Sequence, residues 1–171
     1  MSDVYQIVDA DDKPIGTATR QEIWKQGHYY RRAAILLEDE TGRLLCQRRS
    51  PNLSSYPNRW TASATGHVEI GEDYETTAIR ELHEEIGVNT PLTYIDTVFT
   101  MNIDGNKKVN PFTAIFKGTI ASTTDLKLQS EEVSEAKWFE IADLKHQITD
   151  NPSDFTPTLI NAIERYYDKF S

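Results

Sequence analysis

The stretch that decides the fold is GHVEIGEDYETTAIRELHEEIGV, residues 66–88. It opens with a loop bounded by glycines, and its second part predicts a helix with an apolar stripe packed on a core, because apolar residues recur at spacings of three and four. The stripe consists of Ala78, Ile79, Leu82 and Ile86. Gly87 follows it, and we expect this glycine to end the helix, since glycine adopts the left-handed conformation that helix ends use.

The same helix carries three glutamates on a face of their own. Glu81, Glu84 and Glu85 are three and four residues apart, so they converge on one exposed patch about one turn long. Like charges at these spacings repel by roughly 0.2–0.5 kcal/mol per pair. A divalent cation among them would remove this repulsion and gain hard oxygen ligands. The alternative interpretation is a solvated acidic face with no ligand.

One spacing pattern is complete in this stretch, which favours the metal site. The pattern is G-x5-E-x7-R-E-U-x-E-E-x-G-U, where U is a bulky aliphatic residue, and the probability of a chance match in the chain is on the order of 10⁻⁸. Its positions are filled by Gly66, Glu72, Arg80, Glu81, Leu82, Glu84, Glu85, Gly87 and Val88. In this pattern the chain resembles the Nudix superfamily of MutT-like hydrolases.

The resemblance implies a hydrolase that cleaves the diphosphate bond of a nucleoside diphosphate-linked substrate, with Mg²⁺ or Mn²⁺ as cofactor. The implied metal ligands are the carboxylates of Glu81, Glu84 and Glu85 and the backbone carbonyl of Gly66. Glu84 and Glu85 are also expected to act in catalysis. The family often takes a general base from a distant loop, and Glu132 is our candidate. Its neighbour Glu131 is the alternative, and a surface acid is the other interpretation of each.

Three residues of the stretch are expected to have structural roles. Arg80 lies four residues before Glu84, so it can pair with the acids or with Glu72 and hold the carboxylates in position. Glu72 lies near the helix start, where negative charge suits the helix dipole. Gly87 is the third, as the residue that ends the helix.

Arg48, Arg49 and His67 are the candidate substrate-binding residues. The two arginines alternate on a predicted strand, so one of them should face the site and bind diphosphate oxygens. His67 directly follows the loop glycine and could reach a phosphate, with a packed histidine as the alternative. Aromatic residues could stack on a base, although at strand positions they are more often core. These are Trp60, Tyr30 and Phe112.

The order of the expected elements predicts an α+β fold with a mixed sheet, because strands both precede and follow the central helix. The resemblance independently implies the Nudix fold, a mixed β-sheet sandwiched between α-helices. We expect one domain over 1–171, with an N-terminal hairpin within 1–27, the Nudix-like stretch at 66–88 and a C-terminal helix at 155–170. The other expected strands are 29–39, 43–50, 59–65, 92–103, 109–120 and 137–139, and a further helix is expected at 142–148.

Composition limits the partners. A chain of 171 residues with net charge −9 is the size of one globular domain and disfavours a nucleic acid polymer, since such binding needs clustered Lys and Arg. A small anionic substrate remains compatible with a few local cations.

There is no leader pattern and no apolar run of about 18 residues, so we expect a cytoplasmic protein without a membrane partner. Cys46 lies in an apolar run and is expected to be a buried structural thiol. The oligomeric state stays open, a homodimer included.

Residues 27–72 are also similar to the branch of the superfamily that includes isopentenyl-diphosphate isomerase. The isomerases use a Cys just before the Gly-His pair and a Glu on a later strand. Here Thr65 and Lys108 stand at those positions, and Arg31 replaces a histidine of the early strand. The departures favour the hydrolase, with the isomerase and a non-catalytic nucleotide-binding module as alternatives.

Overall fold

The computed structural model describes residues 3–167. The elements are β1 (Val4–Val8), β2 (Pro14–Thr19), α1 (Arg20–Gln26), β3 (Tyr29–Glu38), β4 (Leu44–Arg49), β5 (Trp60–Thr61), β6 (Ala64–His67), α2 (Tyr74–Ile86), β7 (Thr93–Phe99), β8 (Asn102–Asp104), β9 (Lys107–Thr119), β10 (Val133–Phe139), α3 (Ile141–Asp150), a 3₁₀ turn (Pro152–Asp154) and α4 (Pro157–Tyr166). The helix expected at 155–170 therefore begins at Pro157, and its last three residues, 168–170, lie outside the described part of the chain.

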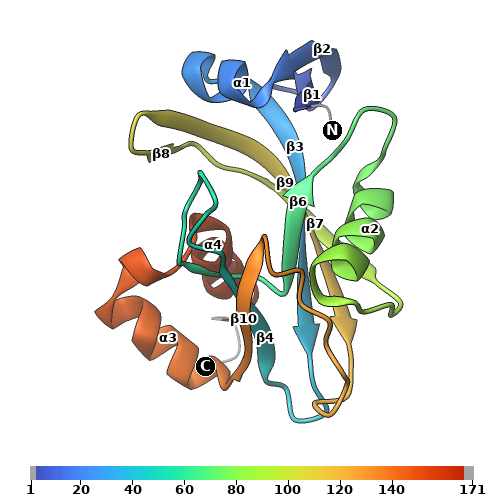
Figure 1. Cartoon of the computed structure of the whole chain (residues 1–171), viewed down its shortest axis with the longest axis vertical. Coiled ribbons are helices and arrows are strands. Elements are labelled where there is room, and N and C mark those ends of the chain that lie inside the picture. The colour runs from blue at the N-terminus through green and yellow to red at the C-terminus, as the bar shows by residue number, and fades with distance from the viewer. Residues whose placement is uncertain (1–2, 168–171) are drawn as a thin grey trace.

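A mixed sheet built around β3 confirms the predicted α+β class. β3 runs parallel to β9 along its whole length, from Tyr29 opposite Asn110 to Glu38 opposite Thr119, and antiparallel to β1, β4 and β6. Helix α2 covers one face of the sheet, and α3 and α4 cover the other (Figure 1). The chain thus forms the three-layer α/β/α sandwich that its sequence implied.

β3 is buried on both faces, as its uninterrupted apolar run predicts. Ala33, Ile35 and Leu37 pack against α2, while Ala34 and Leu36 pack against α3 and α4, and all five are 0% exposed. Fully burying a Leu or Ile side chain contributes about 1.5–3 kcal/mol. This strand therefore holds the layers together and fixes the position of every element that borders the site.

The strand predicted at 59–65 is two short strands that pair with different neighbours. β5 pairs with β4, and β6 pairs with β3, because β3 and β4 are paired only at Leu37–Leu45 and Glu38–Leu44 before they separate. Ser63 fills the gap, since its hydroxyl donates to the Leu45 carbonyl at 2.6 Å and accepts from the Leu37 amide at 2.8 Å. The short strand expected at 137–139 also differs, because it begins earlier, at Val133.

Helix α2 is bounded by strong capping residues but turns a different face inward than expected. The Asp73 side chain caps its start, and Gly87, with φ of 71°, follows its end. Ile79 is 49% exposed and does not belong to the buried stripe, whereas Glu81 and Glu85 are 9% and 3% exposed. The prediction of an exposed acidic face was therefore wrong for Glu81 and Glu85, because α2 also contacts β6 and turns these two glutamates toward it, whereas Glu84 is exposed.

The N-terminal hairpin extends the sheet, because β1 pairs with β3. β1 and β2 form an antiparallel hairpin, a capping box at Thr19 starts α1, and Gly27 ends it with φ of 75°. Ile23 and Trp24 anchor α1 in a cluster of buried apolar and aromatic side chains that includes Tyr30 of β3. No helix among residues 3–167 has the length and apolarity needed to cross a lipid bilayer.

Candidate active site

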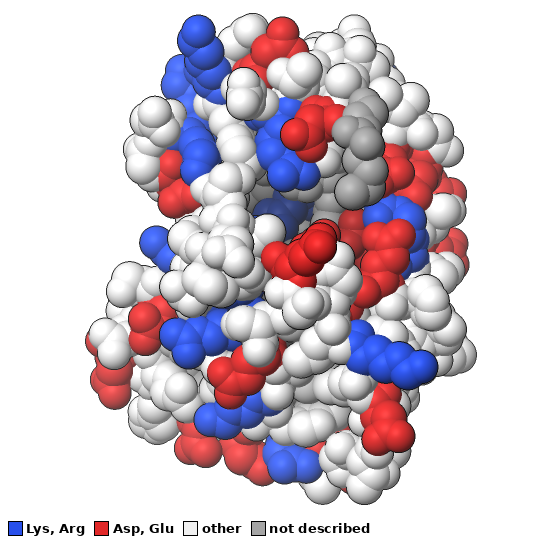
Figure 2. All heavy atoms as spheres, in the orientation of Figure 1, with Lys and Arg blue, Asp and Glu red and all other residues white. Residues whose placement is uncertain are grey.

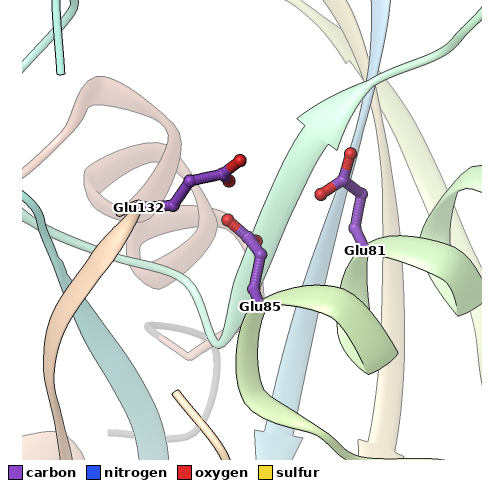
Figure 3. Close-up of side chains that lie close together, drawn as sticks. All are labelled: Glu81, Glu85 and Glu132. Atoms are coloured by element: carbon purple, nitrogen blue, oxygen red, sulfur yellow. The ribbon is translucent and has the colours of Figure 1, made fainter. Parts of the chain in front are cut away.

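Three carboxylates converge at the start of β10. Glu81 and Glu85 come from α2, and Glu132 comes from the loop that precedes β10 (Figure 3). Each offers a carboxylate oxygen that lies within 4.8 Å of the other two. Charged oxygens this close repel one another in a partly buried site, and a bound cation would remove that repulsion. These three residues, the acid triad, therefore have the oxygen ligands and the spacing of a site for a hard divalent cation.

Gly66 on β6 makes room for the triad. A Cβ atom at this position would lie 2.1 Å from the carboxylate Cδ and Oε1 of Glu81. A side chain at position 66 would therefore push Glu81 away. The requirement for glycine here comes from this close approach, and it supports a site in which the Glu81 carboxylate and the strand backbone face the same ligand.

Glu85 is held in place by two donors. Its Oε1 accepts from the Thr65 amide at 2.7 Å and from the Gln47 side chain at 3.2 Å. Gln47 is 1% exposed and also donates to the Ser63 carbonyl, so it fixes the carboxylate from beneath. Our sequence analysis missed Gln47, although a polar residue within the buried run LLCQ is a signal that could have identified it.

Arg80 links the triad to the loop before α2. Its guanidinium donates to both oxygens of Glu72, at 2.7 and 2.9 Å, and to Glu81 at 2.7 Å. A further bond reaches the His67 carbonyl at 3.2 Å. The hydrogen bond from Arg80 is the main reason that the pKa of Glu72 falls to about 2. Glu72 and Arg80 thus form a charged clamp that keeps the Glu81 side chain in the site.

Burial opposes the charge on the two α2 glutamates of the triad. Desolvation is the largest cause that raises the pKa of Glu81 to about 7, although Arg80 acts in the opposite direction. Burial, followed by the charge of Glu81, also raises the pKa of Glu85 well above its ordinary value. A cation would favour the ionised form of both groups, so these residues fit a divalent metal ion.

The other acidic candidates lie outside the triad. The Glu84 side chain is 56% exposed and reaches Arg80 at 3.3 Å, although it still lines the pocket. Glu131 is exposed and borders neither the triad nor the pocket.

Glu132, the third member of the triad, is positioned by its backbone. Its carbonyl accepts from the Ser50 amide at 2.8 Å, and its amide donates to the Gln129 side chain at 3.1 Å.

The triad opens into a pocket of about 520 Å³ whose opposite wall is cationic. Figure 2 shows this hollow, with Lys and Arg atoms along one side and in its depth and Asp and Glu atoms on its rim. Arg49 lies on the cationic wall and donates to the Ser55 carbonyl at 2.8 and 3.1 Å. Burial, and then the charge of Arg32, lowers the pKa of Arg49 to about 10. Arg32 also lines this wall, and our sequence analysis missed it.

Arg48 points away from the pocket. Its Nε donates to the Asn58 carbonyl at 3.0 Å, and its guanidinium lies 5.9 Å from the Trp60 ring centre. The alternation of the two arginines on β4 is therefore as expected, with Arg49 on the side of the site. Among the aromatic candidates, Trp60 packs on Phe139. Phe112 packs on other aromatic side chains, so neither residue lines the pocket.

His67 lines the pocket between two tyrosines. Its ring centre lies 4.7 Å from that of Tyr5 and 5.1 Å from that of Tyr30, which it stacks on at 14°. Burial, and then the charge of Arg32, holds the pKa of His67 well below its ordinary value. The imidazole is therefore neutral and can offer a phosphate one N–H donor but no charge.

The residues at the isomerase positions do not form an acid–base pair. Thr65 lies in the pocket, where its amide binds Glu85, but Lys108 is exposed on β9 and does not line the pocket. Arg31 pairs with Asp12 at 2.8 Å, also outside the pocket. The expected burial of Cys46 is confirmed, because it is 0% exposed and burial raises the pKa of its thiol.

Carboxylates facing arginines across one pocket suit a hydrolase of pyrophosphate bonds, since a cation and guanidinium groups can together neutralise the phosphate oxygens. A family model described as the NUDIX domain matches residues 28–159. The chain belongs to the Nudix family, and it is a Nudix hydrolase that acts on pyrophosphate bonds. Nudix enzymes generally use a divalent metal.

The relatives divide between hydrolases and isomerases. The chain is 31% identical over 162 residues to a prenyl-diphosphate phosphatase from Methanosarcina mazei, covering 94% of this chain and 92% of that protein. An isopentenyl-diphosphate Delta-isomerase 2 from Photorhabdus laumondii is also 31% identical, covering 91% and 88%. A crystal structure from Deinococcus radiodurans matches the fold with a TM-score of 0.80 at 21% identity, covering 96% and 99%.

Proposed function

We propose that this protein hydrolyses the diphosphate bond of a small-molecule substrate with Mg²⁺ as its cofactor. The convergence of Glu81, Glu85 and Glu132 within 4.8 Å, opposite Arg49, is the observation that carries the proposal. Both sides of the pocket suit a diphosphate, because one can hold a cation and the other can bind phosphate oxygens directly.

Each residue of the triad has a proposed role. Glu81 and Glu85 hold the ion, together with the carbonyl of Gly66, and Glu84 binds at the outer edge of the same cluster. When bound, Mg²⁺ would neutralise charge on the diphosphate and lower the pKa of a coordinated water. Glu132 is the most exposed triad member, so it can accept a proton from water that enters the pocket. Arg80 and Glu72 position Glu81, and the Gly87 cap ends the helix that carries it.

The cationic side of the pocket binds the substrate. Arg49 is oriented by its bonds to Ser55, so it can present its remaining donors to phosphate oxygens. Neutral His67 can add one donor and a flat surface. Arg48 supports substrate binding indirectly, because its hydrogen bond to the Asn58 carbonyl holds the loop that borders the pocket.

The organic group of the substrate lies toward the outer rim. A nucleoside diphosphate-linked substrate is the first proposal, because Tyr5 and Trp24 add aromatic surface to the pocket lining. A prenyl diphosphate is the second, because Leu53 and Ile70 add apolar surface to the same pocket and the archaeal relative is a prenyl-diphosphate phosphatase. The reducing environment suited to the free thiol Cys46 supports a cytoplasmic location.

A substrate screen tests the proposal. Nucleoside diphosphates, dinucleotide diphosphates and prenyl diphosphates would be incubated with the protein and Mg²⁺, and product masses recorded. We expect phosphorylated products that require the metal. No metal-dependent cleavage of any diphosphate would overturn the hydrolase and favour the non-catalytic binding module.

A further inference from the structure

Arg32 is a pocket residue whose side chain has no hydrogen-bond or ion-pair partner among residues 3–167. It comes from β3, where its backbone lies opposite His67 on β6 and Thr113 on β9. Its Nε is buried and makes no hydrogen bond, and its guanidinium forms no ion pair within residues 3–167. A buried charged donor without a partner is costly and needs an explanation, and an anionic ligand in the adjoining pocket would supply one.

Arg32 lies in a group of three arginines on one wall. Arg49 of β4 and Arg20 of α1 line the same pocket. The Nε of Arg20 is also buried without a hydrogen bond among residues 3–167, while its Nη2 donates to the Tyr5 hydroxyl at 2.5 Å and lies 3.8 Å from the carboxylate of Asp3, which lines the same pocket. Three guanidinium groups gathered opposite the acid triad, in a chain of net charge −9, make this wall a local site for an anion.

The wall adjoins a small recess. A space of about 30 Å³ shares Arg32, Arg49 and His67 with the main pocket, and buried residues complete its lining. These are Tyr30, Tyr56 and Thr156, which are 2%, 6% and 4% exposed. The Tyr56 hydroxyl is a further buried group without a partner. A space of this size holds about one or two water-sized groups, so it can take phosphate oxygens but not a sugar or a second nucleoside.

We propose that Arg32 binds the outer phosphate of the substrate and that this phosphate is unsubstituted, which makes the substrate class a diphosphate monoester. The assignment rests on the proposed function. An unsubstituted outer phosphate carries three free oxygens and close to two negative charges near pH 7, which suits several guanidinium donors. A diphosphate substituted at both ends would need room for a second organic group beyond the outer phosphate, and a recess of about 30 Å³ does not offer it.

The products follow from this class. Water adds to one phosphorus, the bridging P–O bond breaks, and the proton from water is released or taken up by the phosphate products. A diphosphate monoester therefore gives the organic monophosphate and orthophosphate. A diphosphate substituted at both ends would give two organic phosphates instead.

Variants at Arg32 test the assignment by binding as well as by rate. Calorimetry with methylenediphosphonate, which has no cleavable bridge, would be run in Mg²⁺ on the wild type, Arg32→Gln and Arg32→Lys. We expect Arg32→Gln to weaken binding at least tenfold and to raise KM for ADP or geranyl diphosphate by a similar factor, with a smaller change in kcat. Arg32→Lys keeps the charge and should retain part of the affinity. Arg165→Gln, on the exposed face of α4, is the charge-matched control.

Two results would overturn the assignment. One is methylenediphosphonate binding by folded Arg32→Gln or Arg32→Lys that equals the wild type, with folding judged from the melting curve. The other is wild-type hydrolysis of ADP-ribose or diadenosine diphosphate as efficient as that of the monoesters. If the wild type cleaves no diphosphate but binds methylenediphosphonate through Arg32, the proposed function fails while the anion site stands.

Discussion

At the scale of single residues, the site depends on a position without a side chain and on hydrogen bonds that fix two buried carboxylates. Because Gly66 has no side chain, the Glu81 carboxylate can approach the β6 backbone. Gln47 and the Thr65 amide then fix the buried Glu85 beside it. Two buried acids would be unfavourable in an ordinary core, and their presence is explained if a cation is their usual partner.

Gly66→Ala should separate metal affinity from stability. The new Cβ would meet the far end of the flexible Glu81 side chain, which can move, so we expect a loss of stability below about 1 kcal/mol. The displaced carboxylate should weaken Mg²⁺ binding by about 10–100-fold. Calorimetric Mg²⁺ titration and thermal melting would be measured together, and unchanged metal affinity in the folded variant would contradict the role of Gly66.

The raised pKa of Glu81 predicts a pH effect on the metal-free protein. Its carboxyl titrates near 4.5 when unfolded and at about 7 when folded, so its contribution to stability is present below about pH 4.5 and is lost as the pH rises through 7. Over that window the loss should be on the order of 3 kcal/mol. Buried His67 has the opposite trend, because its folded pKa is lowered, so the measurement needs a matched variant.

That variant is Glu81→Gln, which lacks the titrating group. Urea unfolding in EDTA at pH 5 and pH 8 should show that the wild type loses more stability with rising pH than Glu81→Gln does. Mg²⁺ should reduce the difference, since it favours the charged carboxylate. Equal pH dependence of the two proteins in EDTA would show that Glu81 is not buried as described.

At the scale of elements, α2 has the clearest relation between sequence and structure. Its capping residue Asp73 and its terminal Gly87 are local signals, so both ends could be predicted from the sequence alone. Its orientation could not, because the inward face includes Glu81 and Glu85 and leaves out Ile79. Hydrophobic periodicity assigns glutamate to solvent, and here the packing of α2 against β6 overrides it.

The divergence of β3 and β4 was equally hidden from local pattern. The apolar runs of both strands predict burial, and the structure confirms it. The insertion of Ser63 between them depends on hydrogen bonds to Leu37 and Leu45, which are distant in sequence. Strand pairing is set by such long-range contacts, so the sequence predicted the strands but not the split of 59–65 into β5 and β6.

Gly87→Ala should destabilise the protein more than Gly105→Ala does. Both glycines have positive φ, 71° and 63°, which costs an alanine about 1–2 kcal/mol. Only position 87 adds a steric conflict, because a Cβ there would lie 2.8 Å from the Lys127 Cβ, whereas nothing lies within 4 Å at position 105. Thermal or urea unfolding should show an added loss of about 1–3 kcal/mol for Gly87→Ala. Equal losses would mean that the contact with Lys127 is unimportant.

At the scale of the whole molecule, the pocket joins segments that are far apart in the chain. α2 and the loop before β10 supply the acids, β3 and β4 supply two arginines, and α1 adds Arg20. Glu81 and Glu85 could be predicted because they lie in one contiguous pattern, whereas Glu132 was a candidate only through the family resemblance. Arg32 and Gln47 could not, since each is a single polar residue in a buried strand and only the fold shows what it faces.

The fold also bears on the isomerase alternative. Alkene isomerisation needs a proton donor and acceptor on opposite sides of the substrate, and the chain has Thr65 in the pocket and Lys108 outside it. We expect no enzyme-dependent deuterium exchange from heavy water into the methyl group of isopentenyl diphosphate. Exchange above the rate without enzyme would favour the isomerase.

The central claim is that the acid triad carries the metal that drives diphosphate hydrolysis. The most direct measurement is the rate of phosphate release against Mg²⁺ concentration, in wild type and in Glu85→Gln, with Glu135→Gln on exposed β10 as the control. Glutamine keeps the oxygen that accepts from Thr65 and Gln47 and removes the buried charge, so its metal-free melting temperature should match or exceed that of the wild type. We predict turnover about 100-fold or more below wild type at saturating Mg²⁺. A Glu85→Gln protein that hydrolyses the substrate at the wild-type rate, with the same Mg²⁺ dependence, would contradict the claim.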